Sequence, residues 1–328
     1  MSRTTISAAM LLALAAGDAL AQKAASGSGQ AYPERPVRLV TGYLAGGGSD
    51  FVTRTTGQKL QELLGGTVVV ENRTGGGTNI AAEYVARAAP DGHTLLVGGS
   101  ANTANMTLYR KPGYDIVKDF APVSQLTSGP NILVVHPSVP VKTIQELIAL
   151  ARKNPGLLTY ASAGNASSNH FSGALFTSMA KIDIVHVPYK GGAGAIVDTM
   201  AGHVSMYFST LQTALPHIRS GRVRALAVTT LKRSQAAPEF PTFAESGLPG
   251  FDVAAWHMLL APAGTSPEIV AKLNAEVVRG LAQPDAKQRF GTQGFDVVTT
   301  TPQQLADHIK ADVARSAKII QASGMKVD

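Results

Sequence analysis

Six polar loops hold most of the side chains in this chain that could do chemistry. The loops run over Leu44 to Asp50, Thr74 to Asn79, Gly98 to Thr103, Ser162 to Asn169, Tyr189 to Gly194 and Ser209 to Thr213. They consist mainly of glycine, serine, threonine and asparagine; the charged side chains within them are Asp50 and Lys190, and the imidazole of His170 directly follows the fourth loop. Backbone amides and hydroxyls bind an anion well but provide little acid–base chemistry. The loops therefore predict an anion-binding surface rather than a catalytic site.

Each loop lies between a segment with strand character and a segment with helical spacing. The preceding runs, such as Val37 to Val40 and Ile184 to Val187, are rich in β-branched residues. This alternation is typical of βα units and predicts an α/β fold built on doubly wound parallel sheets. In such sheets the loops after the strands line the crevice where ligands bind.

Capping residues and prolines predict where individual helices begin. We expect helices over Phe51 to Leu64 and Ile80 to Ala88, and another that begins at the capping box of Thr143 and Glu146. Two long C-terminal helices should begin at Pro267 and Pro302, because proline suits the first helical position. Separate strands are expected around Val123 and over Ile132 to Val135.

The candidate ligand-binding residues are the loop positions that offer helix N-terminal amides, hydroxyls or carboxamides. In the first half of the chain they are Gly47, Gly48, Ser49, Thr78, Asn79 and Ser100. In the second half they are Ser162, Asn165, Ser167, Ser168, His170, Tyr189, Lys190, Gly191, Ser209 and Thr210. Tyr43 is a candidate aromatic wall of the crevice, as are Phe208 and Trp256, although strand-end aromatics are about as often plain core. We predict no catalytic residue, metal site or cofactor.

The N-terminus predicts export. Arg3, the apolar stretch Ile6 to Ala16 and the small-x-small site Ala19-Leu20-Ala21 indicate a signal peptide over residues 1–21. The apolar stretch is far shorter than the roughly 20 residues that a membrane span needs. Residues 22–31, rich in Ala, Ser and Gly, are expected to form a linker. A periplasmic location follows from this interpretation.

Length predicts two lobes, because about 300 residues exceed what one core usually organises. We expect lobe 1 to comprise residues 32–131 and 233–328, and lobe 2 residues 132–232. A chain that leaves one lobe and returns to it permits hinge closure around a ligand.

Composition argues against several partners. The chain has 29 Lys and Arg against 22 Asp and Glu, a formal charge of +7, but the basic residues are dispersed, which disfavours a nucleic-acid site. A generally positive field would instead attract small anions. The chain has no cysteine, which excludes disulfides and a cysteine nucleophile.

An enzyme is the alternative function. Gly46-Gly47-Gly48, with Glu71 about 20 residues later, forms part of a dinucleotide fingerprint, but Phe51 occupies the place of the third glycine. A plain turn explains these glycines better. A nucleotide-dependent oxidoreductase or a serine hydrolase acting on a small acid stays open, although no candidate nucleophile has a base near it in the loops.

Several motifs, in order, resemble the periplasmic receptors of tripartite tricarboxylate transporters, the Bug-type solute-binding proteins. They include Val70-Glu71-Asn72-Arg73, Pro90-Asp91-Gly92, Asp119-Phe120-Ala121-Pro122, Val187-Pro188-Tyr189-Lys190-Gly191 and Ala261-Pro262-Ala263-Gly264-Thr265. The resemblance covers nearly all of residues 32–328. It implies a type II periplasmic-binding fold with a ligand cleft between two lobes. It also implies a monomeric receptor that delivers a small mono- or dicarboxylate, aromatic or not, to membrane permease subunits.

Two departures from the family pattern bear on the ligand. Leu44-Ala45 stand where the family commonly has two prolines, so the mouth of the first loop is expected to differ. Ser205 and Ser209 stand in a strand and loop where relatives often carry aspartate. Loss of that negative charge favours a ligand without an ammonium group.

Overall fold

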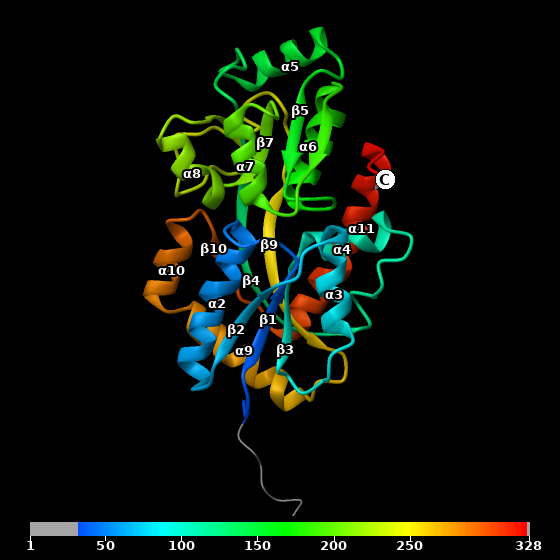
Figure 1. The fold of residues 1–328 in the computed structure, drawn as a ribbon, viewed down its shortest axis with the longest axis vertical. Coiled ribbons are helices and arrows are strands. Elements are labelled where there is room, and N and C mark those ends of the chain that lie inside the picture. Colours follow the sequence, from blue (N-terminus) through cyan, green and yellow to red (C-terminus); the bar gives the residue numbers. More distant parts are fainter. Residues whose placement is uncertain (1–31, 327–328) are drawn as a thin grey trace, which may run out of the picture. The chain divides into compact units, whose positions relative to one another are not determined.

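The computed structural model describes residues 32–326, and its helices and strands lie in one compact unit that begins at Arg35. The predicted signal peptide and linker lie outside the described residues. Ten strands of the described part form one continuous sheet with the order β2-β1-β3-β9-β4-β7-β5-β6, to which β8 and β10 are added through β4. Figure 1 shows helices flanking this sheet along its length.

The first lobe is built on β1, which pairs in parallel with β2 and β3. Its strands are β1 (Val37–Thr41), β2 (Val68–Asn72), β3 (Thr94–Gly99), β9 (Ala254–Pro262), β10 (Asp296–Val297) and the first part of β4 (Phe120–Val135). Its helices are α2 (Gly48–Leu64), η1 (Gly76–Thr78), α3 (Asn79–Ala86), α4 (Ser100–Leu108), α9 (Pro267–Leu281), α10 (Pro284–Gly291) and α11 (Pro302–Ser323).

The second lobe repeats the pattern on β5, which pairs in parallel with β6 and β7. Its strands are β5 (Thr159–Ser162), β6 (Val185–Pro188), β7 (Met206–Thr210), β8 (Arg224–Val228) and the end of β4. Its helices are α5 (Ile144–Lys153), α6 (Ser168–Ala180), α7 (Gly192–Ala201) and α8 (Leu211–Arg219).

One long strand, β4, joins the two lobes. Its first part pairs with β9 and its last residues, Asn131 to Val135, pair with β7, both antiparallel. The expected short strands around Val123 and Ile132 are therefore one continuous strand of 16 residues. The α/β fold with two lobes is confirmed, but antiparallel β9 and β4 make the sheet mixed rather than purely parallel.

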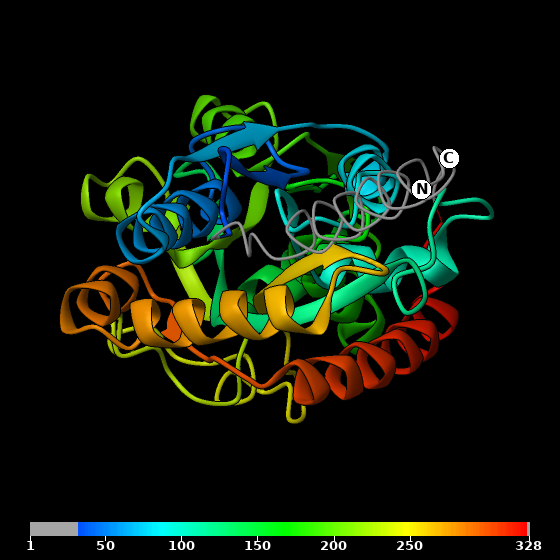
Figure 2. The same cartoon turned by 90° about the horizontal axis from the view of Figure 1, so that it is seen from below.

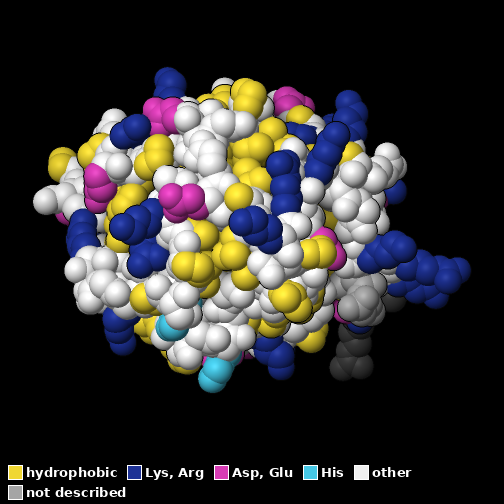
Figure 3. Space-filling model, turned by 90° about the horizontal axis from the view of Figure 1, so that it is seen from above, with side chains coloured by type: hydrophobic (Ala, Val, Ile, Leu, Met, Phe, Trp, Pro, Cys, Tyr) yellow, Lys and Arg dark blue, Asp and Glu magenta, His cyan; other side chains and the backbone are white. Residues whose placement is uncertain are grey.

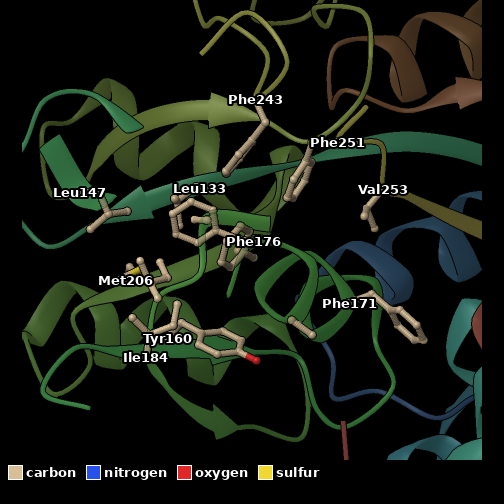
Figure 4. Close-up of a cluster of buried hydrophobic side chains, with 14 of the residues drawn as sticks. Leu133, Leu147, Tyr160, Phe171, Phe176, Ile184, Met206, Phe243, Phe251 and Val253 are labelled. Atoms are coloured by element: carbon tan, nitrogen blue, oxygen red, sulfur yellow. The ribbon is translucent and has the colours of Figure 1, made fainter. Parts of the chain in front are cut away.

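The core of the second lobe is rich in aromatic rings (Figure 4). Phe243 stacks on Phe251 with ring centroids 4.3 Å apart, and Phe176 meets Phe243 edge-on at 5.5 Å. Phe243 and Phe251 thus pack with this lobe although they follow β8 in the chain. This packing favours a second crossing near Val253 rather than at residue 232, and the lobe boundaries stay a prediction.

The last helix, α11, contacts both lobes. Leu305 and Ile309 belong to the same core cluster as Val40 of β1, whereas Ile320 belongs to the cluster that contains Phe171 of α6. Figure 2 shows α9 and α11 beside each other, and both pack against β4. Thr301 caps α11 by accepting a hydrogen bond from the Gln304 amide, and Pro302 occupies the first turn as expected.

The surface agrees with the dispersed charge of the sequence. Figure 3 shows Lys and Arg side chains scattered over one face, with apolar groups between them. Within residues 32–326, no helix is both long and apolar enough to cross a membrane.

Candidate functional site

Five helices point their N-termini into one cavity between the lobes. Helices α2 and α4 come from the first lobe, and α6, α7 and α8 from the second. The cavity has a volume of about 40 Å³. It is lined by Tyr43, Gly47, Gly48, Ser49, Val97, Gly98, Gly99, Ser100, Ala163, Ser167, Ser168, Asn169, Gly192, Tyr207, Thr210, Ala255, Trp256 and His257.

This convergence is suited to an anion. The first amides of an α-helix have no partner within the helix, and the helix dipole places partial positive charge at the same end. Ser167 caps α6 and accepts from the His170 amide, whereas Gly47, Gly99 and Gly191 have no side chain that could cap their helices. At α4, Asn102 Oδ1 accepts a hydrogen bond from the Gly99 amide at 3.0 Å, so that amide is already paired. The uncapped ends leave amides available to a ligand.

Glycine lets the two lobes approach each other closely at this point. A Cβ atom on Gly48 would lie 2.8 Å from Thr210 Oγ1 and 3.2 Å from Phe295 Cζ. A Cβ on Gly47 would lie 3.4 Å from the Gly192 amide nitrogen. A Cβ at Gly48 would therefore require Thr210 or its lobe to move, whereas a Cβ at Gly47 would make only ordinary van der Waals contact with the other lobe.

The cavity wall carries no formal charge. Among the described residues that line it, the titratable ones are Tyr43, Tyr207 and His257. Burial raises the pKa of Tyr43 and Tyr207, and burial lowers the pKa of His257 to about 4. All three side chains are therefore neutral at pH 7, so dipoles and hydrogen-bond donors would have to hold an anion here.

Asp50 holds the first loop in shape. Its carboxylate accepts hydrogen bonds from the Gly46 amide at 3.0 Å, from Arg54 at 2.9 Å and from Asn72 at 2.9 Å. Burial raises its pKa, but the hydrogen bonds from Arg54, Gly46 and Asn72 outweigh burial and lower it. These bonds give Asp50 a structural role in the first loop.

A second hollow of about 190 Å³ adjoins the first, since Tyr43 and Ala163 line both. Four more of the predicted site residues line it: Thr78, Asn165, Tyr189 and Lys190. Thr78 adopts a left-handed backbone conformation with φ of 79° at the start of α3. Lys190 is the one residue with a full charge in this wall among those described.

The other predicted residues, Asn79, Ser162, His170, Gly191 and Ser209, line neither hollow in the described part of the chain. Ser209 is fully buried and donates to the Thr210 carbonyl at 3.0 Å. Ser162 Oγ lies 2.6 Å from His186 Nε2, and the rings of His170 and His186 stack with centroids 3.8 Å apart. These side chains contact neighbouring residues rather than the hollows, and a role for them in binding a ligand stays a prediction.

Several lining residues were not among the predicted ones. Asn169 and Gly192 lie inside two of the polar loops, where no sequence signal distinguished them from their neighbours. Tyr207 lies on β7, just before the loop that begins at Ser209. His257 lies on β9, a strand that the sequence pattern did not indicate, so its neighbourhood could not be inferred. Among these four residues, His257 is the one that adds an imidazole to the cavity wall.

Direct contacts tie the lobes together around the cavity. The Leu44 amide donates to the Lys190 carbonyl across the cleft at 3.0 Å. At the crossing strand, Asn131 is fully buried and its Oδ1 accepts from Asn169 Nδ2 at 2.9 Å. The first loop and the start of α6 are thus both fixed by bonds to other elements.

Comparison with known proteins identifies the family. The model of the tripartite tricarboxylate transporter family receptor matches residues 52–325. The chain belongs to this family. The resemblance seen in the sequence motifs is therefore confirmed.

The chain is also similar to known proteins in sequence and to solved structures in fold. Protein BugT of Bordetella pertussis is 34% identical over 93% of this chain and 94% of its own length. The structure of R. palustris Rpa4515 with adipate is 36% identical, has a TM-score of 0.87, and covers 90% of this chain and 99% of that one. MatC from Rhodopseudomonas palustris with bound malate is 35% identical with a TM-score of 0.84, over 88% and 100% of the two chains.

Proposed function

We propose that this receptor binds a small mono- or dicarboxylate, aromatic or not, in the cavity between its lobes. It works in the periplasm and delivers the ligand to the membrane subunits of a tripartite tricarboxylate transporter. The observation that carries the proposal is the convergence of five helix N-termini on a cavity wall without formal charge. Adipate and malate in two receptors of the same fold support the choice of carboxylate.

The described cavity wall favours an anionic ligand over a cationic one. Unpaired amides and helix dipoles stabilise negative charge, and the described wall offers no carboxylate to an ammonium group. We therefore expect dicarboxylates to bind better than amino acids of the same length. The protein acts as a monomer, without cofactor, and leaves its ligand chemically unchanged.

Calorimetric titration of the mature protein tests this function. The panel contains malate, adipate, benzoate, aspartate, succinamide and NAD, and conversion is followed with stoichiometric protein. Binding of at least one carboxylate without turnover supports the proposal. Binding of NAD alone, or conversion of a small acid, would instead support the enzyme alternative.

A further inference from the structure

A buried chain of three side chains leads from the sheet to the cavity. His257 Nδ1 lies 3.0 Å from Thr127 Oγ1, and His257 Nε2 lies 3.0 Å from Ser49 Oγ. Thr127 and His257 are directly opposed on β4 and β9, and Ser49 lies in the first turn of α2. Ser49 and His257 line the cavity, whereas Thr127 is fully buried behind them.

The ring of His257 is fixed in this position. Phe295 meets it edge-on with centroids 5.6 Å apart and an interplanar angle of 77°. The side chain of His257 is 5% exposed, so water competes little for its nitrogens. A neutral imidazole has one N–H donor and one acceptor nitrogen, and the partners decide which is which.

Thr127 decides the tautomer. Among the residues that the structure describes, His257 Nδ1 is the one hydrogen-bond partner of the Thr127 hydroxyl. A buried hydroxyl without an acceptor is costly, so Thr127 donates its proton to Nδ1. The ring proton of His257 then resides on Nε2 and is donated to Ser49 Oγ.

This arrangement sets the direction of the Ser49 hydroxyl. Ser49 Oγ accepts from His257, and none of the described residues accepts its own proton, which is left for the cavity. In the opposite tautomer, Ser49 would donate to His257 and present only lone pairs to a ligand. Those lone pairs would repel a carboxylate.

We propose that Thr127 and His257 are positioning residues that fix Ser49 as a hydrogen-bond donor, and so select an anionic oxygen at this point of the cavity. The proposal deepens the proposed function and rests on it for the identity of the ligand. Its first test does not need a ligand. Nitrogen NMR of histidine-labelled free protein should show Nδ1 of His257 without a proton and Nε2 with one, the signal being assigned by its loss in His257→Gln.

The second test uses the carboxylate that binds best among malate, adipate and benzoate. Thr127→Val removes the hydroxyl at nearly constant volume and should weaken binding roughly tenfold, as expected for a misdirected bond to a charged group. Thr127→Ser keeps the hydroxyl and should restore affinity. Thr41→Val is the matched control, because Thr41 is also fully buried, its hydroxyl has no partner among the described residues, and it does not line the cavity.

A double variant separates positioning from a general packing defect. If Thr127 acts through Ser49, then Thr127→Val should weaken binding little further in a Ser49→Ala background. Equal weakening in both backgrounds, or a proton on Nδ1 of the parent protein, would overturn the proposal. Failure of every carboxylate to bind would refute the proposed function, whereas the NMR result would still decide the tautomer.

Discussion

At the scale of single residues, buried neutral histidines are the main pH-sensitive feature. Burial and the adjacent His186 lower the pKa of His170 to about 3, and burial lowers the pKa of His186 and of His257 to about 4. In the unfolded chain each would titrate near 6.5. Below that pH the unfolded state binds more protons than the folded state, so the folded state loses stability as the pH falls from about 6.5 towards 4.

The stacked pair allows this pH dependence to be measured. We expect the free energy of unfolding to fall by about 1.6 kcal/mol for each such histidine between pH 6.5 and 5. His186→Phe keeps a ring between Tyr160 and His170, and urea unfolding across this range should show a shallower slope for the variant. An unchanged slope would mean that the pKa of His186 is not lowered in the folded protein.

Gly48 gives a second residue-scale prediction. Gly48→Ala places a Cβ 2.8 Å from Thr210 Oγ1 of the opposite lobe, so closure around a ligand should be hindered. We expect carboxylate affinity to fall at least roughly tenfold, with unfolding stability close to the parent because alanine favours the helix.

Gly291→Ala is the matched control for Gly48→Ala. Gly291 is also helical, but a Cβ there meets nothing within 4 Å. Its ligand affinity should equal that of the parent in calorimetric titration. Parental affinity in Gly48→Ala as well would show that the lobes do not need this close approach.

At the scale of elements, helix ends and the loops before them make the site. Five helices from the two lobes begin at one cavity, so their unpaired N-terminal amides lie around it. The loop before α2 also contributes to closure, because the Leu44 amide bonds to the Lys190 carbonyl before α7. This bond needs an N–H group at position 44.

Leu44→Pro tests the bond across the cleft. Proline has no N–H donor, so the variant should release ligand about fivefold faster, as expected for loss of one neutral hydrogen bond. Leu44→Ala keeps the amide and serves as the control for the side chain. Stopped-flow dissociation of a bound carboxylate measures both, and equal rates for the two variants would rule out the backbone bond as the cause.

For the molecule as a whole, β4 and α11 are the elements that connect the two lobes. β4 pairs with strands of both lobes, and α11 contributes side chains to a core cluster of each. Residues of both lobes line the cavity, so neither lobe alone can offer a carboxylate all of its hydrogen-bond donors. Binding should therefore shift the population towards closed molecules.

Small-angle scattering measures this closure. We expect a smaller radius of gyration with saturating dicarboxylate than without ligand, and a smaller change in Gly48→Ala. An identical profile with and without a ligand shown to bind by calorimetry would indicate a preformed cavity.

Local features of the fold could be predicted from the sequence alone. Caps and prolines located α5, α9 and α11 close to their observed starts, because these signals act within a few residues. The hydroxyl- and glycine-rich loops indicated the anion-binding surface, and eight of the predicted residues line the first cavity: Tyr43, Gly47, Gly48, Ser49, Ser100, Ser167, Ser168 and Thr210. The local sequence pattern was sufficient here because each βα loop leads directly into the helix whose N-terminus forms part of the site.

Which residues lie opposite one another depends on the tertiary structure. The path of β9 brings His257 next to Ser49, 208 positions earlier in the chain, and pairs it with Thr127 of β4. Ser209 lines neither hollow, because its hydroxyl is fully buried and donates to the Thr210 carbonyl. Pairing and register over such separations depend on the packing of the whole sheet, which no local pattern specifies.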